Sequence, residues 1–111
     1  MKGERLGEFE EMVLLSLSWD EESSNAVTIW EVLQKEGERS VSLGAVYAAL
    51  DRLERKKFVT SWLGEPTSVQ GGRRKRFYEL TEEGGATLAE LRRVREHLWR
   101  GRESLHSDKA G

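Results

Sequence analysis

Apolar residues recur at helical spacing in four stretches of this chain. In the first, residues 6–19, the side chains of Phe9, Val13 and Leu17 share one face, and several glutamates suit the start of a helix. In the second, about residues 26–36, Ile29, Trp30 and Leu33 are expected to point inward, after Asn25 as a plausible N-cap. Both stretches predict amphipathic helices.

The third stretch runs from Ser42, a favourable N-cap, to Arg55. Its expected buried stripe is Leu43, Val46, Leu50 and Leu53. At about 100° per residue, the opposite face collects small and cationic residues, namely Gly44, Ala45, Ala48, Arg52 and Arg55, with Asp51 at its edge. Such a face can approach a DNA groove closely, and its arginines can contact the backbone on either side of the groove.

A β-hairpin is predicted next. Its strands are Phe58–Leu63 and Phe77–Leu80, and its turn-rich tip ends in Gly71-Gly72, followed by the basic run Arg73–Arg76. Cations on such a strand are also typical of a solvated edge strand that resists aggregation, and the two interpretations are compatible. A groove-sized helix beside a basic hairpin predicts a winged helix-turn-helix.

The fourth stretch begins after Thr81, a helix cap followed by acidic residues, and is expected to end near Arg100. A lone helix of this length is only marginally helical unless its apolar face is buried, so we expect a second copy of the chain to cover it. Packing back on its own domain is the alternative. The expected dimer-interface residues are Leu88, Leu91, Val94, Leu98 and Trp99.

The predicted fold class is therefore mainly α with a small β-hairpin (α+β). Residues 1–80 are expected to form a winged helix-turn-helix DNA-binding domain, residues 81–101 a C-terminal dimerisation helix, and residues 102–111 a disordered tail.

The charge distribution supports a nucleic-acid partner. The net charge is −2, yet residues 39–76 hold 9 lysines and arginines against 3 acidic residues, a local balance of +6. Residues 1–38 hold 3 against 10, a balance of −7. Affinity for phosphates depends on the local cationic surface more than on the charge of the whole chain.

The sequence gives little support for disulfides, metal sites or catalysis. There is no cysteine, hence no disulfide framework or cysteine-ligated zinc, and the two histidines, His97 and His106, lack metal-ligand spacing. No nucleophile elbow or phosphate-binding glycine loop is present, so we expect no enzyme, no metal and no cofactor. No apolar run is long enough to span a membrane and the N-terminus is too polar for a secretory signal, which fits a cytoplasmic protein.

The candidate DNA-binding residues lie on the third helix and the hairpin: Ser42, Gly44, Ala45, Tyr47, Ala48, Arg52, Arg55, Gly71, Gly72, Arg73, Arg74, Lys75 and Arg76. Tyr47 is either half-buried, with its hydroxyl near the DNA backbone, or part of the core. Among the tryptophans, Trp19 and Trp30 are expected to be core or helix-packing residues, and Trp62 is expected to cover the inner face of the hairpin. Trp99 is either an ordinary interface aromatic or a platform on which a flat effector stacks.

Three blocks of the sequence resemble PadR-family transcriptional regulators. The segment Leu6–Glu10, leading into Val13–Leu17, resembles the opening helix of that family, and Ser42–Glu54 is similar to its recognition helix. Gly72–Gly84 looks like the second wing strand and the start of the last helix. The resemblance covers roughly residues 6–100. One departure is Lys57, where the family usually has glycine.

The resemblance implies a dimeric, repressor-type regulator with one helix after the wing. Some members of the family bind planar aromatic effectors near the dimer interface, so a small aromatic effector is a possible partner. We expect a sequence-specific DNA-binding regulator that binds double-stranded DNA as a homodimer on a pseudo-palindromic operator. The alternatives are a winged-helix protein-interaction module without specific DNA binding, and a protein that coats DNA non-specifically.

Overall fold

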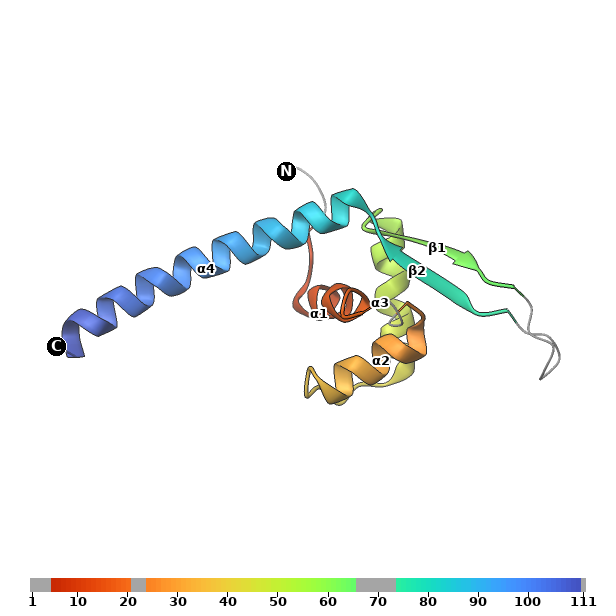
Figure 1. The fold of residues 1–111 in the computed structure, drawn as a ribbon, viewed down its shortest axis with the longest axis horizontal. Helices are drawn as coiled ribbons and strands as arrows, with labels where there is room; N and C mark the ends of the chain where they lie inside the picture. The colour runs from red at the N-terminus through yellow and green to blue at the C-terminus, as the bar shows by residue number, and fades with distance from the viewer. Residues whose placement is uncertain (1–4, 21–23, 66–73, 111) are drawn as a thin grey trace.

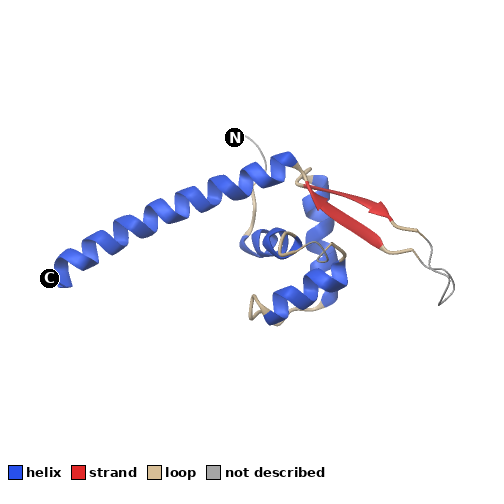
Figure 2. Ribbon diagram, viewed as in Figure 1, coloured by secondary structure: helices blue, strands red, loops and turns tan. Residues whose placement is uncertain are grey.

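A computed structural model describes residues 5–20, 24–65 and 74–110. Its elements, in chain order, are α1 (Glu8–Leu17), α2 (Ala26–Lys35), α3 (Leu43–Arg55), β1 (Val59–Leu63), β2 (Arg76–Leu80) and α4 (Glu82–Ala110). Helices α1 to α3 form the body of the molecule, and α4 and the β-hairpin project from it in opposite directions (Figure 1). The α+β winged-helix architecture predicted from the sequence is confirmed (Figure 2).

The core lies between the first three helices and the base of the hairpin. Its buried apolar side chains are Val13, Leu14, Leu17, Ala26, Ile29, Leu33, Val46, Ala49, Leu50, Leu53, Phe58, Val59 and Tyr78. Leu43, expected in the buried stripe of α3, is only partly buried, whereas Ala49 is fully buried. A small residue at position 49 lets α3 approach its neighbours closely.

Local capping signals define where the helices begin. Asn25 accepts hydrogen bonds from the backbone N–H groups of Val27 (3.1 Å) and Thr28 (3.2 Å), and Ser42 Oγ accepts one from Ala45 (3.1 Å). These contacts confirm both predicted N-caps. Each satisfies backbone donors that the first turn of a helix cannot pair internally.

The turn after α3 is made by Lys57, whose φ of 69° lies in the left-handed region. Lys57 N–H bonds to Glu54 O (3.0 Å) and Phe58 N–H bonds to Leu53 O (2.9 Å), which satisfies the last carbonyls of the helix. The turn therefore has the backbone conformation that glycine adopts most readily, even though the residue is lysine.

The two strands pair antiparallel, in a register that places Val59 opposite Leu80 and Leu63 opposite Arg76. The other edge of β2 is also occupied, because Tyr78 N–H bonds to Ser24 O (2.8 Å) and Phe77 forms an isolated bridge with Asn25. Thus β2 lies between β1 and the start of α2, and the base of the hairpin is fixed on both sides.

Only Thr81 separates β2 from α4. Its hydroxyl accepts a hydrogen bond from Gly84 N–H (2.9 Å) and donates one to Lys57 O (2.8 Å), which confirms the predicted cap. Gly84 is buried against Phe58, so close that an added Cβ would lie 2.3 Å from the Phe58 carbonyl oxygen. The first turn of α4 is therefore packed tightly onto the turn after α3.

Helix α4 has 29 residues and a length of about 43 Å. The expected end near Arg100 and the frayed tail are wrong, because the helix continues through Gly101 to Ala110. One exposed glycine costs a helix only about 1 kcal/mol, and good helix formers such as Arg102 and Glu103 follow it. Within the described residues, no helix is long and apolar enough to cross a membrane.

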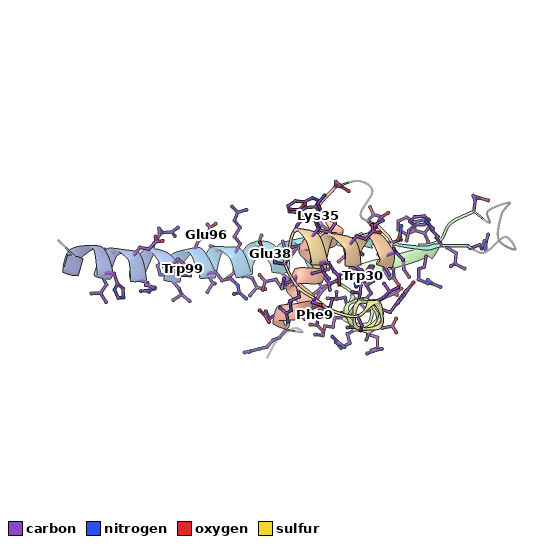
Figure 3. The ribbon with its side chains drawn as sticks, turned by 90° about the horizontal axis from the view of Figure 1, so that it is seen from below. Phe9, Trp30, Lys35, Glu38, Glu96 and Trp99 are labelled. Atoms are coloured by element: carbon purple, nitrogen blue, oxygen red, sulfur yellow. The ribbon has the colours of Figure 1, made fainter. Side chains whose placement is uncertain are left out.

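The tryptophans differ from one another in burial. Trp19 is 57% exposed and not in the core, because α1 ends at Leu17 and leaves Trp19 in the following turn. Trp30 is partly buried in the body, and its indole N–H bonds to Val41 O (2.8 Å), whereas Trp99 lies on the projecting part of α4 (Figure 3). Trp62 packs on Phe77, with ring centroids 6.1 Å apart, and strand alternation places both on the face opposite Tyr78.

The two adjacent glycines of α4 predict opposite effects on stability. In Gly84→Ala, the new Cβ would meet Phe58 O at 2.3 Å and Leu80 Cδ1 at 2.9 Å. The backbone must shift, so we expect the free energy of unfolding to fall by about 1–3 kcal/mol. The control is Gly85→Ala, whose Cβ meets its nearest atom at 3.6 Å.

Because alanine is the better helix former, Gly85→Ala is expected to raise the free energy of unfolding by up to about 1 kcal/mol. Urea unfolding followed by circular dichroism measures both variants. Equal effects of the two substitutions would contradict the tight packing at the root of α4.

Candidate nucleic-acid interface

The exposed face of α3 is the centre of the candidate interface. Gly44, Ala48, Asp51 and Arg55 are exposed, and at positions i, i+4, i+7 and i+11 they form one continuous stripe along the helix. All four positions were predicted from periodicity alone, Gly44, Ala48 and Arg55 as DNA-facing residues and Asp51 as an edge residue. Small side chains near the N-terminus of α3 leave the backbone there accessible to a partner surface.

The residues beside this stripe are partly exposed. Tyr47 is 47% exposed, so its ring is not part of the core. Ala45 is partly buried, and the Ser42 hydroxyl, itself exposed, is engaged in capping α3. Arg55 makes no hydrogen bond or ion pair with any described residue, and its guanidinium is free to meet a partner.

Arg52 differs from Arg55, although the sequence pattern placed the two together. It lies on the side of α3 that faces α1, where its Nε–H donates to Glu10 Oε2 at 2.9 Å. Its side chain is still 44% exposed. Arg52 is therefore held at one edge of its guanidinium and accessible at the other.

Glu10 is the buried centre of this contact, with only 5% of its surface exposed. Oε1 accepts a hydrogen bond from Lys56 Nζ (2.7 Å) and another from Gly7 N–H (2.9 Å), while Oε2 accepts the bond from Arg52. Lys56 Nζ also donates to Arg5 O (2.7 Å). One carboxylate thus joins the start of α1 to the last turn of α3.

These bonds determine the ionisation of Glu10. Burial by itself raises the pKa of the carboxyl group, but hydrogen bonds from Lys56, Gly7 N–H and Arg52, with the charge of Lys56, outweigh it. The net effect lowers the pKa of Glu10 from 4.5 to about 2. The side chain is an anion at any pH at which a cell operates.

A second contact connects α3 to the hairpin. Arg76 Nη1 donates to Ser61 Oγ (2.9 Å), and the Ser61 hydroxyl donates to Glu54 Oε2 (2.8 Å). The first cation of β2 therefore lies next to α3. Arg74 and Lys75 are also exposed, whereas the predicted tip residues Gly71, Gly72 and Arg73 lie outside the described residues.

Sequence reasoning missed the two carboxylates that organise these cations. Glu10 was interpreted only as one of several acidic residues favourable at the start of a helix, and Glu54 as part of the recognition-helix segment. The available signal for Glu10 was its position one turn before the apolar residues Val13 and Leu14, on a face that the pattern predicts to be buried.

The predicted interface residues of α4 become more exposed along the helix. Leu88 packs against the core of its own domain and Leu91 is partly exposed, whereas Val94 (38%), Leu98 (65%) and Trp99 (58%) are exposed. Arg95 forms an ion pair with Glu11 of α1 (2.7 Å) beside a groove between the two helices that Leu15 also lines. Arg102 lies over the ring of Trp99, with Cζ 5.9 Å from the centroid.

Metal binding has no geometric support in the described segments. No group of three or more His, Asp or Glu side chains within residues 5–20, 24–65 and 74–106 is placed to hold a metal ion.

The family assignment follows from a comparison of the sequence. The profile of the Transcriptional regulator PadR-like family matches residues 13–90, which include the whole of α2, α3 and the hairpin. The chain belongs to this family. As a PadR-like protein it is a transcriptional regulator with a DNA-binding winged helix, which confirms the resemblance seen in the sequence.

Solved PadR-like structures are similar over most of the chain. A PadR-like transcription factor from Bacteroides fragilis is 26% identical, with a TM-score of 0.69 over 87% of this chain and 88% of that one. A PadR-like transcriptional regulator from Bacillus cereus strain ATCC 14579 is 22% identical, with a TM-score of 0.67 over 87% of this chain and 89% of that one. A PadR family transcription regulator from Clostridium difficile R20291 is 24% identical, with a TM-score of 0.57 over 93% of this chain and 99% of that one.

The two last-named structures support the fold alone. No curated protein is significantly similar to this chain in sequence.

The low pKa of Glu10 predicts a pH-dependent stability. The folded-state pKa of about 2 lies below the ordinary value of 4.5, so ionised Glu10 stabilises the fold above pH 4.5. This contribution, about 3 kcal/mol, is lost as the pH falls through 4.5 towards 2. We expect the difference in unfolding free energy between the wild type and Glu10→Gln to be largest near neutral pH and to shrink over that window.

Urea unfolding at a series of pH values measures this difference. Glu8→Gln is the matched control on the same helix, because Glu8 is exposed and lies 3.5 Å from Arg39, and exposed pairs contribute at most about 1 kcal/mol. A difference for Glu10→Gln that stays constant from pH 7 to pH 2 would disprove the assigned role of the carboxylate.

Proposed function

We propose that this PadR-like protein is a homodimeric, sequence-specific repressor that inserts α3 into the major groove of DNA. The observation that carries the proposal is the exposed stripe of α3, with Gly44 and Ala48 at one end and Arg55 at the other, beside the cations of the hairpin. Arg76 is linked to α3 through Ser61 and Glu54, so both sets of cations belong to one surface.

Each candidate residue has a proposed role. The N-terminal end of α3, with Ser42, Gly44, Ala45 and Ala48, lies deepest in the groove, because the recognition helix of this fold type contacts bases with its N-terminal residues. Arg52 and Arg55 contact phosphates or guanine edges, to which a guanidinium can bond bidentately. Tyr47 directs its hydroxyl to the DNA backbone. The wing, Gly71–Arg76, supplies contacts that set affinity and register more than sequence choice.

A second copy of the chain is the proposed cover for the exposed side of α4. Leu91, Leu98 and Leu105 recur every seven residues, the spacing by which helices pair, and Leu98 and Leu105 are 65% and 56% exposed. Leu15 of α1, 50% exposed, adds an apolar position next to the α1–α4 groove. Pairing through this side buries residues that a lone projecting helix leaves in water.

The dimer explains how an operator is selected and blocked. Two copies of α3 would contact successive major grooves, roughly 34 Å apart, of a pseudo-palindromic site. Repression then follows from occlusion of the promoter. For a planar aromatic effector at the dimer interface, Trp99 is the residue that we assign, because its ring is large, exposed and already pairs with one cation, Arg102.

Substitution of Arg55 tests the DNA-binding surface. Arg55 makes no contact within the described part of the protein, so Arg55→Ala should leave the thermal stability unchanged. We expect it to weaken binding to an operator duplex and to reduce the slope of log K against log salt by about 1, if the guanidinium neutralises one phosphate. Fluorescence anisotropy at several salt concentrations gives both values.

The control is Lys35→Ala, which removes an exposed cation from α2. Identical affinity and salt slope for Arg55→Ala and the wild type would remove α3 from its assigned role. If the wild-type protein binds an acidic protein and is not retained on duplex DNA, the winged-helix interaction module is favoured instead.

Substitution of the α4 leucines tests the dimer. Leu91→Glu combined with Leu98→Glu places two charges on the proposed contact side, and sedimentation velocity should then show monomers. The matched control is Arg93→Gln with Arg100→Gln, because these residues lie on roughly the opposite side of α4 and have the same seven-residue spacing. A dimer that persists in the leucine variant would mean that α4 does not mediate assembly.

A further inference from the structure

Arg52 and Arg55 both lie in the last turns of α3, but they differ in their contacts with the rest of the protein. Arg55 has no partner within the described residues, whereas Arg52 is bonded through Nε–H to Glu10 at 2.9 Å. The terminal amino groups of Arg52, Nη1 and Nη2, make no hydrogen bond with the described part of the chain. Since the side chain is 44% exposed, these groups remain accessible from outside.

This arrangement suits a guanidinium that is to meet a planar acceptor. Phosphate oxygens and the guanine edge are bound through two parallel N–H groups, and the orientation of the guanidinium plane decides whether both can bond at once. An arginine that is already held in one rotamer loses less conformational entropy on binding than a free one. Holding Arg52 by Nε leaves the Nη1–Nη2 edge available.

The position of Glu10 is not explained by packing alone. Helices α1 and α3 are already joined by buried apolar side chains, among them Val13, Leu14, Val46 and Leu50. Well-packed apolar residues of similar volume often stabilise a fold as much as a buried ion pair does, or more. Oε1 of Glu10 is saturated by Lys56 and Gly7, so Oε2 is the atom committed to Arg52.

We propose that Glu10 is a positioning residue for DNA recognition, which holds Arg52 by its Nε–H and keeps the Nη1–Nη2 edge of the guanidinium available to DNA. The inference rests on the proposed function, because it requires that α3 contacts DNA. It assigns different tasks to the two arginines. Arg52 is preorganised for a directional contact, and Arg55 acts as an unrestrained cation. The low pKa of Glu10 ensures that the carboxylate is charged wherever DNA binding takes place.

A double-mutant cycle tests the proposal. The probe is a duplex selected from a random-sequence library by the wild-type protein, and dissociation constants are measured by anisotropy for the wild type, Glu10→Gln, Arg52→Ala and the double variant. We expect each single substitution to weaken binding by about tenfold, the size of one lost directional contact. In the Arg52→Ala background, Glu10→Gln should have almost no further effect, because Glu10 acts through Arg52.

The matched control is the same cycle with Arg55→Ala in place of Arg52→Ala. There the losses should multiply, since Arg55 does not contact Glu10. Losses that multiply in both cycles would overturn the proposal, because they would mean that Glu10 supports only the fold. Glu10→Gln that binds the duplex as tightly as the wild type would overturn it as well.

A second measurement needs no variant and so does not depend on whether Glu10→Gln folds. The Arg52 Nε–H resonance of the wild-type protein is followed by ¹⁵N NMR in the free state and in the complex with the selected duplex. We expect a resolved signal in slow exchange with water in both states. Rapid exchange in the complex would show that Arg52 leaves Glu10 to bind DNA, which overturns the proposal.

The experiment distinguishes failure of the proposed function from failure of the positioning role. A wild type that selects no duplex at all removes the proposed function and the positioning role together. A wild type that selects a duplex and loses affinity in Arg52→Ala, but with losses that multiply in the Glu10 cycle, removes the positioning role only.

Discussion

Arg52 of α3 and Lys56, the residue that follows α3, share one buried carboxylate, that of Glu10 on α1. Because Arg52 and Lys56 are one helical turn apart, this contact fixes the last turn of α3 relative to the first turn of α1. The chain then passes directly through the turn at Lys57 into β1. The position of the hairpin, and with it the spacing between the cations of the wing and those of α3, therefore depends on the geometry around Glu10 together with the contacts of β2 with Ser24 and Asn25.

Much of the fold could be predicted because the relevant signals are local. The caps Asn25, Ser42 and Thr81 act on backbone groups within three residues, so their identity and spacing were enough to place the starts of three helices. The exposed stripe of α3 also follows from periodicity alone. Lys57 stands where the family usually has glycine, and its residue type alone does not indicate the left-handed turn that the structure has there.

The features that could not be predicted depend on contacts between distant segments. Glu10 and Arg52 are 42 positions apart, and no pattern along the chain links them before the helices are packed. Trp19 was expected to be a core or helix-packing residue, but the end of α1 at Leu17 leaves it 57% exposed. Gly101 suggested a helix end, yet a glycine on an exposed helix is a weak stop signal when favourable residues follow it.

The short connection between β2 and α4 has a mechanical consequence. Thr81 alone separates β2 from α4, and Gly84 packs tightly against Phe58. The direction of α4 therefore cannot change through the connecting segment without moving the hairpin. A tilt of about 10° at the root displaces the far end of a helix about 43 Å long by about 7 Å. The same leverage acts in reverse, so a small reorientation imposed on the distal part of α4 would swing the winged-helix body as a rigid unit.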